Sequence, residues 1–552
     1  MKKICMSIIP VFIVIISIQF LHAQTSESHL DSVYKENFNW YNLDLKKNKI
    51  AGVSTEKAYS VLLKGKTPSK KIIVAVIDGG VDIEHEDLKD VIWTNKNEIP
   101  GNGKDDDNNG YIDDVHGWNF LGNAKGENLN QENLEYTRII RDMQTGFKDV
   151  KSENDVPVRK LKDYKMYLAS KVMYDKKLKE YTSSKDAINS FINKIDDSQA
   201  VIKKFLKKDT LIAEDVKSIS STDKEINDAQ KFLLNVYDKK ISKSALESYQ
   251  KHNDLYLDKY LNFDFNERNK IIGDDPKNIL NKDYGNNDVE GPDAGHGTMV
   301  AGIIAAKRNN GIGINGIADN VEIMVLRVVP DGDERDKDVA LAIRYAADNG
   351  ANIINMSFGK AFSPQKQFVD DAIKYAETKN VLLIHAAGND GLNNDSIEHY
   401  PSKILNDNSI VKNLMNVGAS SKLKDNKFAA VFSNYGQSVD LFAPGVSIVT
   451  TTPNNKYDDA NGTSFSCPVV SGIAALVWSY YPRLTAVQLK DILLQSVVSY
   501  KKLKVNLPNL DSKKAEVKKV SFAELCKTGG EANAYKALVA AEKFVNGTGK
   551  KK

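Results

Sequence analysis

Apolar runs rich in β-branched residues recur along the chain and constrain its fold more than any other feature. The first is KIIVAVIDGG at residues 71–80, and patterns with helical spacing fall at 336–349 and 364–379. Further apolar runs lie at 321–329, 351–357, 381–387 and 414–419. Continuous runs of this kind are typical of strands buried on both faces of a parallel sheet. Their alternation with helices predicts an α/β fold with a doubly wound, mostly parallel sheet flanked by helices, whose functional residues gather at the carboxyl ends of the strands.

The segment 121–270 differs from the rest of the chain. It is rich in charged residues, and its apolar residues recur at helical spacing, as in Ile188, Phe191, Ile192 and Ile195. This periodicity favours a large helical insertion over a disordered linker, because a linker has no reason to keep apolar residues in register. The charges are interpreted as a solvated helix face, and no partner is assigned to them.

The first 23 residues predict a signal peptide. Two lysines precede an apolar stretch that ends near Leu21, and the small residue Ala23 follows. This is the layout of a secretory signal that is cut after a small residue. An uncleaved membrane anchor is the alternative, since the apolar stretch is about long enough to span a bilayer. Contact with a membrane is expected only in that case.

Charge and cysteine content bear on possible partners and on disulfide bonds. The 76 basic and 73 acidic residues give a formal net charge of +3, which offers no reason to expect nucleic-acid binding. Of three cysteines, Cys5 falls in the signal, and Cys467 and Cys526 remain. These two could pair in an oxidising compartment, but the apolar neighbours of Cys467 favour a buried free thiol.

Three short stretches each place a reactive side chain among small residues. Asp78 lies in AVIDGGVD, His296 in DAGHGTMVAG, and Ser464 in NGTSFSCPVVSG, at the start of an apolar helical pattern. Taken singly, they read as a turn aspartate, a packed histidine and a helix-capping serine. Together they form the set that a serine nucleophile needs, namely a histidine base and a carboxylate to orient it.

The same stretches resemble the motifs of the subtilisin-like serine proteases, or subtilases. GTSFSCP is similar to the G-T-S-x-x-x-P of the family, HGTMVAG to its H-G-T-H-V-A-G, and VAVIDGGVD to its strand ending in Asp-Ser-Gly. The resemblance implies that Ser464 is the nucleophile, His296 the general base and Asp78 the orienting carboxylate. HAAGND resembles the segment that supplies the oxyanion-hole asparagine, which implies that role for Asn389.

The resemblance also implies a substrate class and a pocket. Polypeptides are the expected substrates, and no cofactor is required for the chemistry. Ser357, Gly359 and Gly388 are expected to border the pocket for the side chain before the cleaved bond. Small residues at these edges indicate a roomy pocket that does not select a fixed charge.

The resulting domain organisation follows the resemblance and the changes in texture. We expect a signal peptide at 1–23 and an N-terminal extension at 24–70. A subtilisin-like peptidase domain follows at 71–120 and 271–500, with the helical insertion at 121–270 between the Asp78 and His296 segments. A C-terminal tail with a helix covers 501–552.

A run of acidic and amide residues at 105–110 resembles the first half of a calcium-binding loop. Oxygen-bearing side chains alternate before Gly110, but the twelfth position is His116, where the full pattern has a glutamate. Asp113 is the alternative ligand. An acidic turn without a metal is the competing interpretation, so the sequence makes a structural calcium ion possible without naming its site.

The sequence therefore predicts an exported serine endopeptidase, periplasmic or secreted, that forms an acyl-enzyme. Two alternatives stay open. One is an exported binding or scaffold protein that uses the helical insertion, and the other is a membrane-tethered processing protease with narrow specificity.

Overall fold

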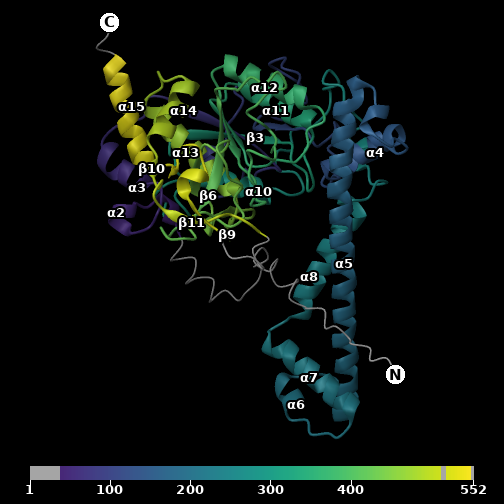
Figure 1. Cartoon of the computed structure of the whole chain (residues 1–552). Coiled ribbons are helices and arrows are strands. Elements are labelled where there is room, and N and C mark those ends of the chain that lie inside the picture. Colours follow the sequence, from purple (N-terminus) through teal and green to yellow (C-terminus); the bar gives the residue numbers. More distant parts are fainter. Residues whose placement is uncertain (1–37, 511–517, 549–552) are drawn as a thin grey trace. The chain divides into compact units, whose positions relative to one another are not determined.

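A computed structural model describes residues 38–510 and 518–548 (Figure 1). The predicted signal peptide at 1–23 lies outside the described residues. The chain divides into two compact units, and Tyr136–Asn266 forms the smaller one. Of the described residues, the larger unit includes 38–135, 267–510 and 518–548.

A nine-stranded sheet forms the centre of the larger unit. Its strands, in spatial order, are β10 (Val498–Ser499), β13 (Gly530–Glu531), β7 (Leu441–Pro444), β6 (Leu414–Ser420), β5 (Leu382–Ala386), β4 (Ile353–Met356), β1 (Ile72–Asp78), β3 (Val321–Arg327) and β2 (Gly117–Asn119). All neighbouring pairs are parallel except β10 with β13. The predicted mostly parallel sheet is confirmed.

Helices cover both faces of this sheet, as the continuous apolar strands predict. In β1, Val74 and Val76 belong to the core cluster that includes α13 (Thr463–Tyr480). Ala75 and Ile77 belong to the cluster that includes α11 (Asp336–Asp348) and α12 (Lys366–Thr378). The helices of the larger unit are α2 (Leu45–Asn48), α3 (Thr55–Lys57), α9 (Glu267–Ile271), α10 (Gly295–Ala305), α11 (Asp336–Asp348), α12 (Lys366–Thr378), α13 (Thr463–Tyr480), α14 (Ala486–Gln495) and α15 (Ala534–Thr548). The doubly wound arrangement follows, because alternate residues of one strand enter different cores.

Two short antiparallel pairs complete the larger unit. They are β8 (Ile448–Thr452) with β9 (Lys456–Ala460), and β11 (Lys504–Asn506) with β12 (Lys519–Ser521). In the described part of the chain, α13 is the one helix that is long and apolar enough to cross a membrane, and 89% of that stretch is buried inside the protein. Its apolar character is therefore that of a core helix.

The smaller unit is entirely helical, as predicted for the insertion. Its helices are α4 (Glu135–Phe147), α5 (Leu161–Leu206), α6 (Ala213–Lys217), α7 (Lys224–Asp238) and α8 (Lys243–Leu255). The long α5 packs against α7 and α8 (Figure 1), and Ile188 and Ile195 lie in a core with Val236 and Leu246. The apolar periodicity of the sequence therefore marks real packing faces.

The smaller unit begins at Tyr136, whereas the sequence placed the start of the insertion at 121. Residues of the intervening stretch pair with the larger unit, since Arg327 Nη2 donates to the carbonyl of Leu129 at 2.7 Å. The backbone N–H of Glu132 likewise donates to the carbonyl of Asp331 at 3.0 Å, and the N–H of Asp331 donates to the carbonyl of Asn130 at 2.8 Å. Pairing of this kind leaves no signature in composition, so the sequence could not locate it.

The segment before β1 forms part of the main core. Trp40 and Tyr41 are fully buried there, and the indole N–H of Trp40 donates to the carbonyl of Ser447 at 2.8 Å. Val53 accepts a backbone hydrogen bond from Ala534, and Ser54 accepts one from the side chain of Asn533. The described part of the predicted N-terminal extension is thus an integral layer of the larger unit.

Replacing Trp40 with alanine tests this structural role. We expect a loss of about 3–5 kcal/mol in the free energy of unfolding, because a large buried side chain leaves a cavity and an unpaired carbonyl. Thermal unfolding of the variant measures the change. Val61→Ala in the same segment is the matched control, since Val61 is 60% exposed and its loss should be nearly neutral. Equal melting temperatures for the two variants would contradict an integral role for the segment.

Candidate active site

Asp78 and His296 form a hydrogen-bonded pair at the carboxyl end of β1. Asp78 is the last residue of that strand, and His296 lies in the first turn of α10. The His296 Nδ1 atom lies 2.8 Å from Oδ1 and 3.0 Å from Oδ2 of the carboxylate. A carboxylate only accepts hydrogen bonds, so Nδ1 carries a proton, and in the neutral imidazole Nε2 presents a lone pair.

A glycine allows α10 to approach the end of β1 this closely. A Cβ on Gly297 would lie 2.0 Å from the carbonyl oxygen of Gly80 and 3.2 Å from the Cβ of Asp78. Any larger residue next to His296 would push the helix away from the strand. Gly297 of the HGT motif therefore helps to place His296 close to Asp78.

The electrostatics of the pair favour a charged imidazole. Burial acts to lower the pKa of His296, but the charge and hydrogen bond of Asp78, aided by the charge of Asp293, outweigh it and raise the pKa above the usual 6.5. His296 is nevertheless open to a reactant, because 42% of its side chain is exposed. Asp78 is almost fully buried at 3%.

Ser464 lies at the second residue of α13, beside this pair. The ring of Phe465, the next residue, is 5.5 Å from the ring of His296 between centroids. Ser464 is half-buried. Its backbone N–H belongs to the first helical turn, where N–H groups lack an intrahelical acceptor. A helix start with free donors suits a site at which negative charge develops.

Burial separates Ser464 from the other two serines of its motif. Ser466 is buried and donates to the carbonyl of Ala443 at 2.9 Å. Ser471 is buried and donates to Oδ1 of Asn355 at 2.8 Å. Both hydroxyls are engaged within the core, so Ser464 is the one of the three that a substrate can reach.

Asn389 lies against the start of α13 and takes over the capping role that the sequence alone allowed for Ser464. Its Oδ1 accepts hydrogen bonds from the backbone N–H of Thr463 at 2.8 Å and from the Thr463 hydroxyl at 2.9 Å. Its Nδ2 lies close to Gly462, 3.6 Å from where a Cβ would stand. With the oxygen held on the helix, the NH₂ group is the end of the amide that is available to donate.

Ser357 stabilises the start of α13 through a hydrogen bond to the backbone of Ser464. Pro468 has no N–H to offer the carbonyl of Ser464 one helical turn earlier. The hydroxyl of Ser357 donates to that carbonyl at 2.8 Å and so satisfies it. Ser357 is only 2% exposed, which makes its side chain a support for the helix start and places it out of reach of a substrate.

Cys467 and Cys526 are free thiols, and both are buried. Desolvation raises the pKa of Cys467 to about 12, and its Sγ lies 3.2 Å from two acceptors for its single S–H, Asn355 Oδ1 and the carbonyl oxygen of Ile384. The prediction of a buried free thiol at Cys467 is confirmed. Its proximity to Ser464 in sequence therefore adds no second nucleophile.

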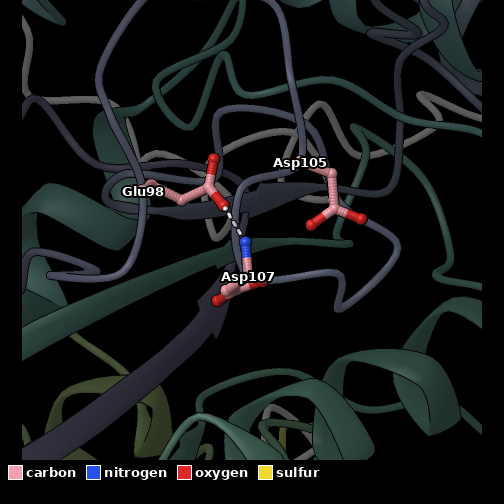
Figure 2. Close-up of side chains that lie close together, drawn as sticks. All are labelled: Glu98, Asp105 and Asp107. Atoms are coloured by element: carbon pink, nitrogen blue, oxygen red, sulfur yellow. Dashed lines mark hydrogen bonds between the residues drawn. The ribbon is translucent and has the colours of Figure 1, made fainter.

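The acidic loop after β1 brings together three carboxylates that the sequence only partly identified. Ligand atoms of Glu98, Asp105 and Asp107 all lie within 4.8 Å of one another (Figure 2). The sequence did not identify Glu98 as a ligand, because Glu98 precedes the loop and the calcium-loop pattern has its glutamate at the end. Asp113 is engaged elsewhere, accepting from the backbones of Asn102 and Gly103, and His116 Nδ1 bonds the carbonyl of Trp93. Three carboxylates form a donor set that suits a hard cation such as Ca²⁺.

The acid limb of the pH–rate profile follows from the Asp78–His296 pair. Only neutral His296 can accept a proton, so kcat/KM should rise with pH through a pKa above 6.5. Asp293→Asn removes one negative charge that raises this pKa and should move the limb to lower pH. Measuring kcat/KM against pH for both proteins checks this, with Asp90→Asn as an exposed control. A limb that does not move in Asp293→Asn would contradict the electrostatic account.

Comparisons with known proteins show the family of the chain. A model of the subtilase family matches residues 69–523. Alkaline elastase YaB of Bacillus sp. (strain YaB) is 38% identical over 198 residues, which are 36% of this chain and 48% of the elastase. The thermophilic serine proteinase of Bacillus sp. (strain AK1) is 40% identical over 207 residues, 37% of this chain and 48% of the proteinase.

Subtilisin BL of Lederbergia lenta is 36% identical over 206 residues, which are 37% of this chain and 71% of the subtilisin. The alignments with the elastase and the thermophilic proteinase span about half the length of those relatives. The family model covers most of this chain, including β1, α10 and α13, which carry Asp78, His296 and Ser464. The chain belongs to the subtilase family of serine endopeptidases.

Proposed function

We propose that this chain is an exported serine endopeptidase that hydrolyses peptide bonds through an acyl-enzyme formed on Ser464. One observation carries the proposal. The hydrogen-bonded Asp78–His296 pair lies beside the start of α13, where Ser464 is the accessible serine of its motif. Nucleophile, base and orienting carboxylate are then all supplied by neighbouring elements.

In the first half of the reaction, Ser464 Oγ attacks the carbonyl carbon of the substrate while its proton passes to His296 Nε2. Asp78 holds the Nδ1 proton and stabilises the imidazolium that forms. The NH₂ of Asn389 and the N–H of Ser464 donate to the oxyanion of the tetrahedral intermediate. His296 then gives its proton to the leaving amine, and the acyl-enzyme remains.

In the second half, water replaces the amine. His296 takes a proton from the water, whose oxygen attacks the acyl carbon, and then returns the proton to Ser464 Oγ as the acid product leaves. The route uses only side chains and backbone groups of this chain. Polypeptides are the proposed substrates.

Hydrolysis of a denatured protein substrate by three proteins tests the proposal. Wild type should cleave, Ser464→Ala should not, and Ser466→Ala should retain activity because its hydroxyl only bonds Ala443 within the core. Equal cleavage by Ser464→Ala and wild type would remove the proposed mechanism. Absence of cleavage by folded wild type would favour the alternative of an exported binding or scaffold protein.

Export rests on the signal-like start of the sequence and on the relatives. One of them, from Bacillus subtilis (strain 168), is a cell wall-associated protease that is 35% identical over 210 residues. We propose cleavage after Ala23, giving a periplasmic or secreted enzyme. Sequencing the amino terminus of the mature protein distinguishes this from a chain that stays anchored by its first residues.

Among the described residues, one cluster of carboxylates is suited to hold a calcium ion. Glu98, Asp105 and Asp107 would bind it through carboxylate oxygens, and the ion would join the acidic loop to the segment before it. We propose a structural role only. None of these three residues belongs to the set that performs the proposed chemistry.

A further inference from the structure

The helical insertion has one end that lies far from the segments joining it to the rest of the chain. Ile140 of α4 and Phe263 pack in one cluster with Tyr164 and Tyr167, in the first turns of α5. The chain therefore enters and leaves the smaller unit near the start of that helix. α5 continues to Leu206, and at 1.5 Å per residue the stretch beyond Tyr167 is about 60 Å long. Figure 1 shows α6 beside this far end of α5.

Two large apolar side chains are exposed at the far end. Phe205, in the last turn of α5, is 42% exposed, and Ile212, directly before α6, is 60% exposed. Their neighbours differ, because Ile202 and Val216 are buried in the local core and Leu206 packs against it. Packing within the unit therefore explains the apolar character of these neighbours but not that of Phe205 and Ile212.

A carboxylate holds the two exposed side chains at the same end of the unit. Asp215 accepts a hydrogen bond from the backbone N–H of Ile212 at 3.2 Å, and it also pairs with the ammonium group of Lys208. Lys208 comes three residues after Phe205, at the point where α5 ends. The start of α6 is thus tied to the end of α5, so Ile212 and Phe205 belong to one surface region.

Lysines surround the exposed phenylalanine. The sequence at 203–208 is KKFLKK, which has four positive charges and no acidic residue. Lys204 and Lys207 are exposed, and neither forms an ion pair with a residue that the structure describes. The wider stretch 203–217 contains five lysines and three acidic residues, which leaves a net charge of +2. The end of the insertion is therefore both apolar and positively charged.

This combination suits the surface of a lipid bilayer with anionic headgroups. Exposed apolar side chains beside lysines are typical of segments that lie in the interface, where the apolar groups enter the boundary between headgroups and acyl chains. Each ammonium group near such a surface adds attraction to the lipid phosphates. A bilayer accepts Phe205 and Ile212 without a shaped pocket, whereas a protein partner has to supply a pocket for each side chain.

We propose that residues 203–212, here called the tip, form a docking surface for an anionic lipid bilayer. Phe205 and Ile212 enter the interface, and the lysines lie against the lipid phosphates. The sequence connected membrane contact only with an uncleaved signal peptide, and the tip is independent of that segment. The inference goes beyond the proposed function, because the tip contains none of the residues assigned to peptide hydrolysis.

Sedimentation with lipid vesicles tests the proposal. The protein without residues 1–23 is used, because an uncleaved apolar stretch would itself bind lipid. Wild type should bind vesicles made of equal parts of phosphatidylcholine and phosphatidylglycerol. It should bind much less to phosphatidylcholine alone, and high salt should weaken the binding to the anionic vesicles.

Two double variants assign the binding to the tip. Lys204→Gln with Lys207→Gln should weaken binding to anionic vesicles by about tenfold or more, because two attractive charges are lost. Phe205→Ser with Ile212→Ser should weaken it to a similar extent, about tenfold, because the apolar groups that enter the interface are lost. Both variants should keep the wild-type kcat/KM on a small soluble peptide, which shows that the protein is folded.

Matched controls come from the middle of α5. Lys176→Gln with Lys179→Gln removes two exposed lysines of the same helix, and Val172→Ser removes an apolar side chain that is 70% exposed. Both controls should bind vesicles as wild type does. Equal weakening by the tip variants and the controls would show attraction spread over the whole helix and would overturn the assignment to the tip.

A fluorescent label reports whether the tip enters the bilayer. Cys467 and Cys526 are buried, so a thiol introduced by Phe205→Cys can be labelled selectively with nitrobenzoxadiazole. Its emission should shift to the blue and rise when anionic vesicles are added, whereas the same label at Val172→Cys should not respond. A label at position 205 that stays in water while the protein is bound would overturn the proposal. No binding by folded wild type at low salt would also reject a lipid partner and leave an acidic protein as the occupant of the tip.

Discussion

Replacing Asp78 with asparagine is expected to lower kcat by about 10⁴-fold. The carboxylate accepts the Nδ1–H of His296 through both oxygens and also accepts the N–H of Gly79 at 2.8 Å. In the variant, the amide oxygen can still accept the N–H of Gly79, and the NH₂ group then faces Nδ1 of His296. That contact favours the tautomer with the proton on Nε2, which cannot take a proton from Ser464.

Steady-state kinetics on a small peptide substrate measure this effect. Asp90→Asn is the control, since Asp90 is exposed and only pairs with Lys307. Its activity should match that of wild type. A loss of less than tenfold in Asp78→Asn, in a protein with wild-type thermal stability, would show that His296 does not depend on Asp78 for its tautomer.

Replacing Asn389 with aspartate is expected to lower kcat by about 100- to 1,000-fold with little change in KM. The substitution keeps an oxygen for the two donors of Thr463 but replaces the NH₂ with a second oxygen, which repels a developing oxyanion. Asn389 is exposed, so the new charge is solvated and the fold should be retained.

Asn389→Ala separates the two roles of this residue. It loses the oxyanion donor and also leaves the N–H and hydroxyl of Thr463 without their acceptor. We therefore expect Asn389→Ala to be both less active and less stable than wild type. Asn389→Asp should be less active but should keep the stability of wild type. Wild-type kcat in either variant would exclude Asn389 from oxyanion stabilisation.

The sequence predicted most of the central sheet because each long strand is a continuous apolar run. β1, β3, β4, β5 and β6 fall within the predicted runs or one residue beyond them. The edge strands β2 and β10, and β13 next to β10, have two or three residues each, too few for any periodicity. Their position is set by pairing with distant segments, which local sequence does not record.

The residues of the candidate site were likewise predictable only in part. Motifs with a fixed local pattern led to Asp78, His296, Ser464 and Asn389, and the structure brings them to the carboxyl ends of the strands and the start of α13. Glu98 lies outside any such pattern, because it precedes the acidic loop.

The role of Ser464 is tested most directly by locating a covalent adduct. Wild-type protein is treated with a fluorophosphonate and digested, and the modified residue is identified by mass spectrometry. The account predicts one adduct, on Ser464, that forms faster as pH rises through the pKa of His296 and is absent in Ser464→Ala. An adduct on Ser466 or Ser471, or no adduct in folded wild type, would contradict it.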